Sequence, residues 1–344
     1  MTVLFASGED TGFTLIGAVA GSIINSASRS TYARNTNTSV NAYNSTSTAD
    51  PPANRLQTPQ FTSTNTIWVH AQMAPQVSNA GTANEQALII RSPDGVGRIV
   101  VRQTGTAGTL KVSTRNAAGS FVDLATASAA YSTGVITQLD LRVDYIALGT
   151  VQLYLGGAQV INWTGDPRTD SATLLDQVDL ASINNGNTAA TGTCWSEVIV
   201  ADEDTRGMAL WTLTLTGAGT TQSWSPNTLA NINKAVINDS TAIASSTANQ
   251  LSEWATVTTP PVGSWGVKAV VQETRMEVGV TGPQHFDYLL RVASTDYLAG
   301  LSLAPTTSYT NFSNQLWPSN PATAADWSLS DLTTGIQVGV KSLT

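Results

Sequence analysis

Apolar and polar residues alternate with a period of two in several stretches of this chain, and this rhythm limits what the chain can fold into. Residues 108–115, 139–145 and 150–155 follow the pattern. The middle stretch places its apolar residues on one face and its charged residues, Asp140, Arg142 and Asp144, on the other. Because successive side chains of a strand point to opposite faces, the pattern predicts antiparallel sheets with one buried and one wet face.

Turn residues separate these stretches at short intervals. Gly156 and Gly157 form a two-residue link between two strand-like runs, which is a strong hairpin signal. Ser-Pro-Asp-Gly at 92–95 and Asn-Ala-Ala-Gly at 116–119 separate two further pairs of runs. Consecutive hairpins of this kind are typical of β-sandwiches and jelly rolls. The best helical candidate, at 246–254, is short.

Composition excludes several classes of function. Only 12% of the residues are charged, and 16 Lys and Arg face 24 Asp and Glu, for a net charge of −8. A nucleic-acid binder needs clustered basic residues, so we expect no nucleic-acid partner. The apolar run at 13–24 is too short to span a bilayer, and no basic residue precedes it. We therefore expect neither membrane insertion nor a secretory signal.

The length of 344 residues predicts more than one core, because single cores stop growing at roughly 250–300 residues. A charge cluster at 202–206 follows a strand-like run, so we place a jelly-roll domain at 1–203 and a second, smaller β-sandwich domain at 204–344. The stretch 25–60 is rich in Ser, Thr, Asn and Ala. It predicts either a long loop of the first domain or an arm that reaches a neighbouring subunit.

No set of residues points to catalysis. Cys194 is the only cysteine, and His70 and His285 are the only histidines. Neither histidine has a cysteine or a paired carboxylate close by in the sequence, so we expect structural histidines and no metal site. The acidic residues at 202–204 are adjacent and follow a strand, which favours a solvated turn over a calcium site or a glycosidase pair. We expect no enzyme activity and no cofactor.

Tryptophan is the remaining candidate for recognition, because its ring can stack on sugars or anchor an interface. Trp195 and Trp211 lie on alternating stretches and are expected in the core. Trp317 and Trp327 lie in a polar loop region, where a core role and an interface role are both open. These two are the candidate interaction residues.

Residues 134–200 resemble the back half of a concanavalin-A-like (laminin-G-like) jelly roll. The resemblance rests on the alternating strand, the glycine hairpin within 150–160 and the closing run Trp195–Val200. It implies an antiparallel jelly-roll fold for the first domain. The calcium and sugar ligands of that family have no matching positions in this sequence, so it implies no ligand site.

The chain as a whole resembles structural proteins of tailed bacteriophages. The Thr/Ala/Ser/Asn-rich composition, the C-terminal segment 326–342 and the run 266–275 carry this resemblance. It implies a non-enzymatic virion component, in the tail tip, fibre or baseplate region or as a head appendage, assembled in the host cytoplasm. Its partners would be other virion proteins, further copies of the chain and host-surface glycans.

Two alternatives stay open. One is a capsid decoration protein, with the 25–60 segment reaching across capsomers, and the other is a carbohydrate-binding module. A glycoside hydrolase or lyase would need two facing carboxylates, for which the sequence offers no candidate pair.

Overall fold

The structure is a computed structural model that describes residues 2–8, 12–16, 40–43, 55–75, 85–106, 108–169, 172–183, 192–232, 238–257, 264–333 and 335–344. The chain divides into two compact units, Met1–Leu210 and Trp211–Thr344. Our sequence analysis placed the boundary after residue 203. The prediction of an all-β fold with antiparallel sheets is confirmed.

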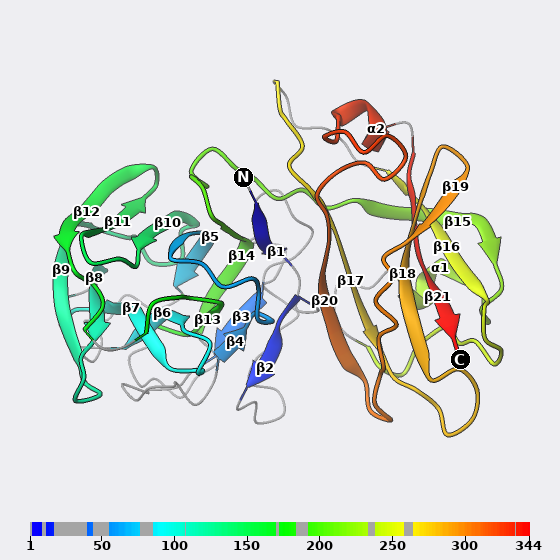
Figure 1. Cartoon of the computed structure of the whole chain (residues 1–344), viewed down its shortest axis with the longest axis horizontal. Helices are drawn as coiled ribbons and strands as arrows, with labels where there is room; N and C mark the ends of the chain where they lie inside the picture. The colour runs from blue at the N-terminus through cyan, green and yellow to red at the C-terminus, as the bar shows by residue number, and fades with distance from the viewer. Residues whose placement is uncertain are drawn as a thin grey trace. The chain divides into compact units, whose positions relative to one another are not determined.

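Unit 1 is a sandwich of two seven-stranded antiparallel sheets, which Figure 1 shows as two layers. Sheet A has the order β1-β14-β5-β10-β11-β12, with β3 paired to β14. Its strands are β1 (Val3–Ser7), β3 (Val40–Tyr43), β5 (Thr66–Pro75), β10 (Thr137–Asp144), β11 (Gly149–Leu155), β12 (Ala158–Gly165) and β14 (Gly192–Ala201).

Sheet B has the order β2-β4-β13-β6-β7-β8-β9. Its strands are β2 (Thr14–Ile16), β4 (Arg55–Gln57), β6 (Gln86–Arg91), β7 (Gly97–Gln103), β8 (Thr109–Arg115), β9 (Phe121–Ala130) and β13 (Gln177–Leu180). The predicted hairpins at 92–95, 116–119 and 156–157 are confirmed, because they join β6 to β7, β8 to β9 and β11 to β12.

The core of unit 1 forms where the apolar residues of the two-residue rhythm meet between the sheets. Leu139, Leu141 and Val143 of β10 are fully buried there, together with Trp195 of β14. The indole N–H of Trp195 donates to the carbonyl of Ala181 at 3.0 Å, so its polar edge is satisfied inside the core. The polar residues of the same strands consequently point away from this core.

Two sequence predictions need correction here. The segment 25–60 contains β3 and β4, which pair with β14 and β13, so it is not a single loop or arm; the rest of this segment is outside the described residues. The helical candidate 246–254 is instead the turn before β16 and the first half of that strand, Leu251–Val257. Two apolar residues three positions apart were too few to indicate a helix, and Trp254 is buried in the sheet core.

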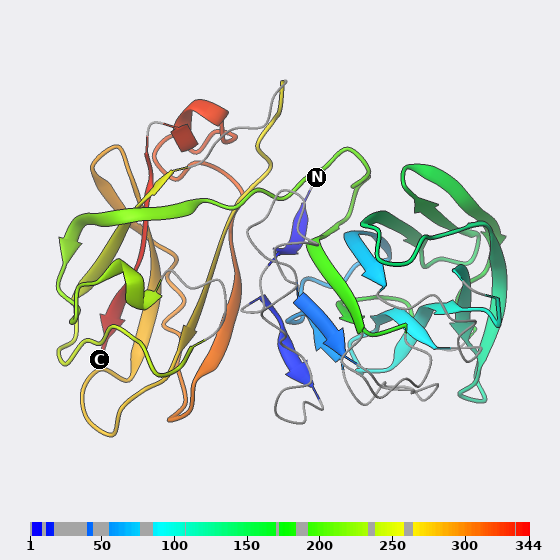
Figure 2. The same ribbon diagram turned by 180° about the vertical axis from the view of Figure 1, so that it is seen from behind.

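Unit 2 is a smaller sandwich. A five-stranded sheet, β15-β16-β21-β18-β19, and the pair β17–β20 form its two layers (Figure 2). Its elements are β15 (Thr214–Gln222), α1 (Leu229–Ile232), β16, β17 (Val270–Met276), β18 (His285–Val292), β19 (Thr295–Leu298), β20 (Thr310–Trp317), α2 (Leu329–Thr333) and β21 (Gln337–Leu343). No helix within the described residues is long and apolar enough to cross a membrane.

Gly339 lies in the middle of β21, where the backbone of β16 comes very close. Glu253 of β16 and Arg291 of β18 lie on either side of β21, and their Oε1 and Nη1 atoms are 3.6 Å apart. A Cβ atom at position 339 would lie 2.1 Å from the carbonyl oxygen of Ser252. Only glycine therefore fits here without a shift of the backbone.

Candidate functional site

The structure places both candidate interaction residues in the core of unit 2. Trp317 is 7% exposed and Trp327 is 3% exposed. The indole N–H of Trp327 donates to the carbonyl of Trp317 at 2.7 Å, and that of Trp317 donates to Gln272 Oε1 at 2.7 Å. Both rings are thus packed and hydrogen-bonded inside the unit, and neither presents a free face in this structure.

The other tryptophans divide differently from the sequence expectation. Trp195 is buried, as expected, but the prediction for Trp211 is wrong, because it is 38% exposed and lies before β15 instead of within a strand. Trp265 is 42% exposed. Both exposed rings lie in irregular chain, where no alternation can indicate burial.

The polar residues of sheet A form a more developed candidate site. We call the outward side of β5, β10, β11 and β12 the polar face. One row crosses these four strands, because Trp68, Arg142, Gln152 and Asn162 are successive partners in the strand pairing. Trp68 is buried, Arg142 and Gln152 are half-buried, and Asn162 is exposed. The row therefore runs from covered to open surface.

Hydrogen bonds join the row into one network. Gln152 Oε1 accepts from Arg142 Nη1 at 3.4 Å and from the Tyr154 hydroxyl at 3.2 Å. The amide nitrogen of the same glutamine donates to Asn162 Oδ1 at 3.1 Å. Arg142 also pairs with Asp144 of its own strand at 2.8 Å. These contacts hold planar polar groups in one orientation along the face.

An aromatic pair lies at the covered end of the row. The rings of Trp68 and Tyr154 stack with centroids 6.2 Å apart and an interplanar angle of 22°. The Arg206 guanidinium lies 4.6 Å from the Tyr154 centroid and 5.5 Å from that of Trp68. Arg142 lies 5.7 Å from the Trp68 centroid. Two cations thus contact one aromatic surface.

A buried His–Asp pair occupies the next row of the polar face. His70 Nδ1 and Asp140 Oδ1 are 2.8 Å apart, and both side chains are fully buried. Asp140 also accepts from Gln138 Nε2 at 2.7 Å and from the Thr205 hydroxyl at 3.2 Å. Each carboxylate oxygen therefore has a donor. The sequence shows no carboxylate close to His70, and strand pairing brings Asp140 beside it.

The two arginines of this site, Arg206 and Arg142, each pair with a nearby carboxylate. Arg206 pairs with Asp204, two residues earlier, through both of its carboxylate oxygens at 2.9 and 3.0 Å from Nε. This hydrogen bonding lowers the pKa of Asp204 and raises the pKa of Arg206. Arg142 has Asp144 in the same role. The charges of the two pairs therefore balance.

The acidic cluster 202–204 belongs to this region. Asp204 is the partner of Arg206, and Asp202 Oδ1 accepts from the backbone N–H of Thr2 at 2.7 Å. Within the described residues, no group of three or more His, Cys, Asp or Glu side chains is placed to hold a metal ion. Cys194 is buried on β14, and His285 Nδ1 contacts the carbonyl of Thr344 at 2.9 Å.

Sequence reasoning missed this site. The alternation correctly separated Asp140, Arg142 and Asp144 from the core-facing residues, but it predicted a wet face, and Asp140 and Asp144 are buried. Nothing in the sequence said which strands are neighbours. The signal that could have found the site is the recurrence of polar and aromatic residues at alternate positions of 66–75 and 150–155, in phase with 139–145. Arg206 lies outside any strand, so no periodicity could indicate it.

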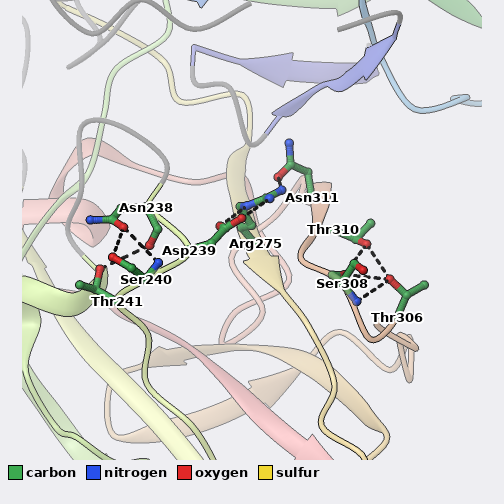
Figure 3. A network of polar contacts seen from close by, with 9 residues as sticks. All are labelled: Asn238, Asp239, Ser240, Thr241, Arg275, Thr306, Ser308, Thr310 and Asn311. Carbon is green, nitrogen blue, oxygen red and sulfur yellow. Dashed lines mark hydrogen bonds and ion pairs between the residues drawn. The ribbon is translucent and has the colours of Figure 1, made fainter. Parts of the chain in front are cut away.

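A second polar cluster lies in unit 2 and is shown in Figure 3. Arg275 of β17 donates to both carboxylate oxygens of Asp239 at 2.7 Å and to Asn311 Oδ1 at 2.8 Å. Its guanidinium also lies 5.6 Å from the Tyr309 ring centroid. All three nitrogens of the guanidinium are engaged, so this cluster ties the turn at 238–241 to β17 and β20. We assign it a structural role.

Comparisons with known proteins add likenesses of fold. No protein-family model and no curated protein matches the sequence. An endo-β-1,4-glucuronan lyase from Trichoderma reesei has 13% identity and a TM-score of 0.41, over 58% of this chain and 95% of the lyase. The calreticulin globular domain of T. cruzi has 11% identity and a TM-score of 0.39, over 59% of this chain and 89% of that domain.

The carbohydrate-binding module CBM66 from Bacillus subtilis has 11% identity and a TM-score of 0.32, over 54% of this chain and 93% of the module. Likenesses this distant assign no function to the chain. The function has to be argued from the residues of the site itself.

Proposed function

We propose that unit 1 is a carbohydrate-binding module that holds an uncharged saccharide on the polar face and performs no chemistry on it. The observation that carries this proposal is the hydrogen-bonded row of Arg142, Gln152 and Asn162 beside the Trp68–Tyr154 stack. Amide and guanidinium groups offer paired donors and acceptors to neighbouring hydroxyls. Aromatic rings offer an apolar surface to the C–H face of a sugar.

The extent and charge of the face support an uncharged oligosaccharide. Strands in a sheet lie about 4.8 Å apart, so a row across four strands is about 14 Å long. This suits a short stretch of a sugar chain better than a single small ion. The two arginines of the site are each paired with a carboxylate, Asp144 or Asp204, so no net positive charge attracts an anion.

The His70–Asp140 pair supports binding over catalysis. A general acid or base must come within hydrogen-bond reach of the substrate atom that it serves. Both side chains are fully buried, and Asp140 is already occupied by three donors. Their geometry suits the fixing of neighbouring strands and of the Thr205 hydroxyl.

The test measures saccharide binding by calorimetry and on a glycan array. We expect the protein to bind neutral oligosaccharides, and we expect the double variant Gln152→Ala/Asn162→Ala to lose about tenfold or more in affinity, since two hydrogen-bonding side chains are removed. Gln284→Ala, an exposed glutamine of unit 2, is the matched control and should bind as the unaltered protein does. Equal binding by the double variant would contradict the proposal.

A second candidate function is a structural role in a tailed-bacteriophage particle, in the tail or as a head appendage. Its support is the resemblance of the C-terminal segment 326–342 to phage virion proteins. In the structure, Trp327 and β21 of this segment pack in the core of unit 2. Other virion proteins and further copies of this chain would be the partners, and glycan binding by unit 1 would then serve contact with the host surface.

Mass spectrometry of purified particles tests this second candidate. We expect the chain among the particle proteins, and its absence from them would refute a virion role. The copy number separates the sites within a particle: a dozen or fewer copies favours the tail, and hundreds favour a capsid decoration protein. This result is independent of whether unit 1 binds sugars.

A further inference from the structure

The residues that cover the aromatic stack come from outside the sheet. We call residues 202–206 the strap. They form no strand or helix, and they follow β14 directly. The Arg206 side chain lies over the rings of Tyr154 and Trp68, which are only 7% and 6% exposed. The apolar surface that a sugar ring would stack on is therefore already occupied by a side chain of the same protein.

Arg206 itself is held to the polar face by fewer contacts than the start of the strap. The Thr205 hydroxyl donates to Asp140 at 3.2 Å, and the backbone carbonyl of Arg206 accepts from Gln138 Nε2 at 3.2 Å. The guanidinium stacks on the rings of this face, while Thr205 is fully buried and Asp202, at the start of the strap, exchanges hydrogen bonds with the backbone of Thr2. Single hydrogen bonds of this length contribute little net free energy. The residue after Arg206 is Gly207, and a Cβ atom added at this position would have no neighbouring atom within 4 Å.

The ion-pair partner of Arg206 belongs to the strap itself and not to the sheet. Arg206 is neutralised by Asp204, whose carboxylate belongs to the same five residues. If Arg206 instead paired with an acid of the sheet, its departure would leave a charge on the sheet without a partner. With Asp204 as its partner, Arg206 can leave the rings without breaking its ion pair, because both residues belong to the strap. The guanidinium and its counter-charge enter water together, which avoids the cost of separating them.

We propose that the strap is a built-in competitor for the saccharide, and that binding requires Arg206 to leave the Trp68–Tyr154 stack. This inference rests on the proposed function of unit 1 and adds the control of its site. The ligand meets the open row of Gln152 and Asn162 first, and the aromatic surface becomes available only when the strap lifts. The affinity measured for the unaltered protein is then the intrinsic affinity reduced by the fraction of molecules whose strap is open.

The experiment compares saccharide affinity in strap variants. The probes are neutral hexasaccharides of β-glucose, β-mannose, β-xylose and α-glucose, titrated by calorimetry. Arg206→Ala removes the stacked cation, so we expect binding about tenfold tighter than that of the unaltered protein. Thr205→Val removes one anchor and keeps the shape of the side chain, and it should tighten binding by about threefold.

Unit 1 contains a matched control. Arg168 pairs with Asp166, two residues earlier, in the same arrangement as Arg206 with Asp204, but it lies in the loop after β12. Arg168→Ala should leave the affinity unchanged. In the unaltered protein, saturating hexasaccharide should also speed hydrogen exchange at residues 202–206, an effect that a purely structural arginine would not produce.

The outcomes separate the two proposals. If the unaltered protein binds a hexasaccharide and Arg206→Ala binds it equally or more weakly, Arg206 is not a competitor and the strap inference is overturned while the proposed function stands. If neither the unaltered protein nor any strap variant binds a probe, the proposed function is wrong, and the inference that rests on it is overturned too. Tighter binding by Arg206→Ala, with Arg168→Ala unchanged, supports both.

Discussion

Replacing His70 with alanine tests how strongly the buried pair of the polar face is coupled. Asp140 has three donors in the structure, from His70, Gln138 and Thr205. His70→Ala removes one of them and leaves the carboxylate fully buried with two. Asp140→Ala removes the carboxylate and leaves the imidazole and the two other donors without their acceptor.

The magnitudes follow from burial and from the kind of hydrogen bond. Removing a donor from a fully buried carboxylate leaves a charged group short of a partner and also deletes a buried side chain, so we expect His70→Ala to lower the free energy of unfolding by about 4 kcal/mol. Asp140→Ala leaves neutral donors and should cost about 3 kcal/mol. The double variant should cost about 5 kcal/mol and not the sum of about 7, which gives a coupling energy of about 2 kcal/mol.

Urea unfolding, followed by tryptophan fluorescence at pH 7 and assigned to the transition of unit 1, measures these energies. His285→Ala is a control for the loss of an imidazole outside unit 1, because this ring bonds to the carbonyl of Thr344 in unit 2, and it should leave the transition of unit 1 unchanged. If the losses in free energy of unfolding of the two single variants sum to that of the double variant within about 0.5 kcal/mol, the pair does not act as a unit and our account of the polar face is wrong.

Three further predictions concern unit 2. Burial and the nearby Asp296 raise the pKa of Glu253 above its ordinary value of 4.5, so the native unit keeps a proton that the unfolded chain loses. The free energy of unfolding of unit 2 should therefore fall as pH rises above 4.5. Glu253→Gln should abolish that part of the pH dependence, as measured by urea titrations at several pH values. Gly339→Ala should cost more than about 2 kcal/mol, because its Cβ would meet a backbone carbonyl. Trp327→Ala should cost about 3–5 kcal/mol through the cavity that it leaves.

Each of these has a comparison that can contradict it. An unchanged pH slope in Glu253→Gln would show that another group carries the proton. Gly266→Ala, at a position with no atom within 4 Å of the added carbon, should be tolerated, and equal costs at 266 and 339 would exclude the steric explanation. Trp265→Ala, at an exposed ring, should cost less than about 1 kcal/mol in the same unfolding assay.

The sequence predicted the sheets well because a two-residue rhythm is a local property. Leu139, Leu141 and Val143 face the core as their alternation indicated, and Gly156–Gly157 forms the hairpin that its turn chemistry required. The same logic failed at Trp254, because the run around it is too short to distinguish a helical period from a strand period. It also failed at Trp211, because the predicted strand began earlier than β15 does.

The candidate site was harder to predict because its parts meet only through strand order. His70 and Asp140 are 70 residues apart, and Asp140 and Thr205 are 65 apart. No local pattern records which outward-facing strands become neighbours, so Arg142 and Gln152 looked like ordinary solvated residues. The placement of Trp317 and Trp327 in the core has a related cause, because the polar residues around them in the sequence do not surround them in the fold.

The close approach of β16 to Gly339 has a consequence for how this chain can diverge. A homologue that carries any side chain at this place in the strand has no room for it unless the pairing of β16 with β21 has changed as well. A change at position 339 is therefore expected only together with a change in the backbone of β16 beside it.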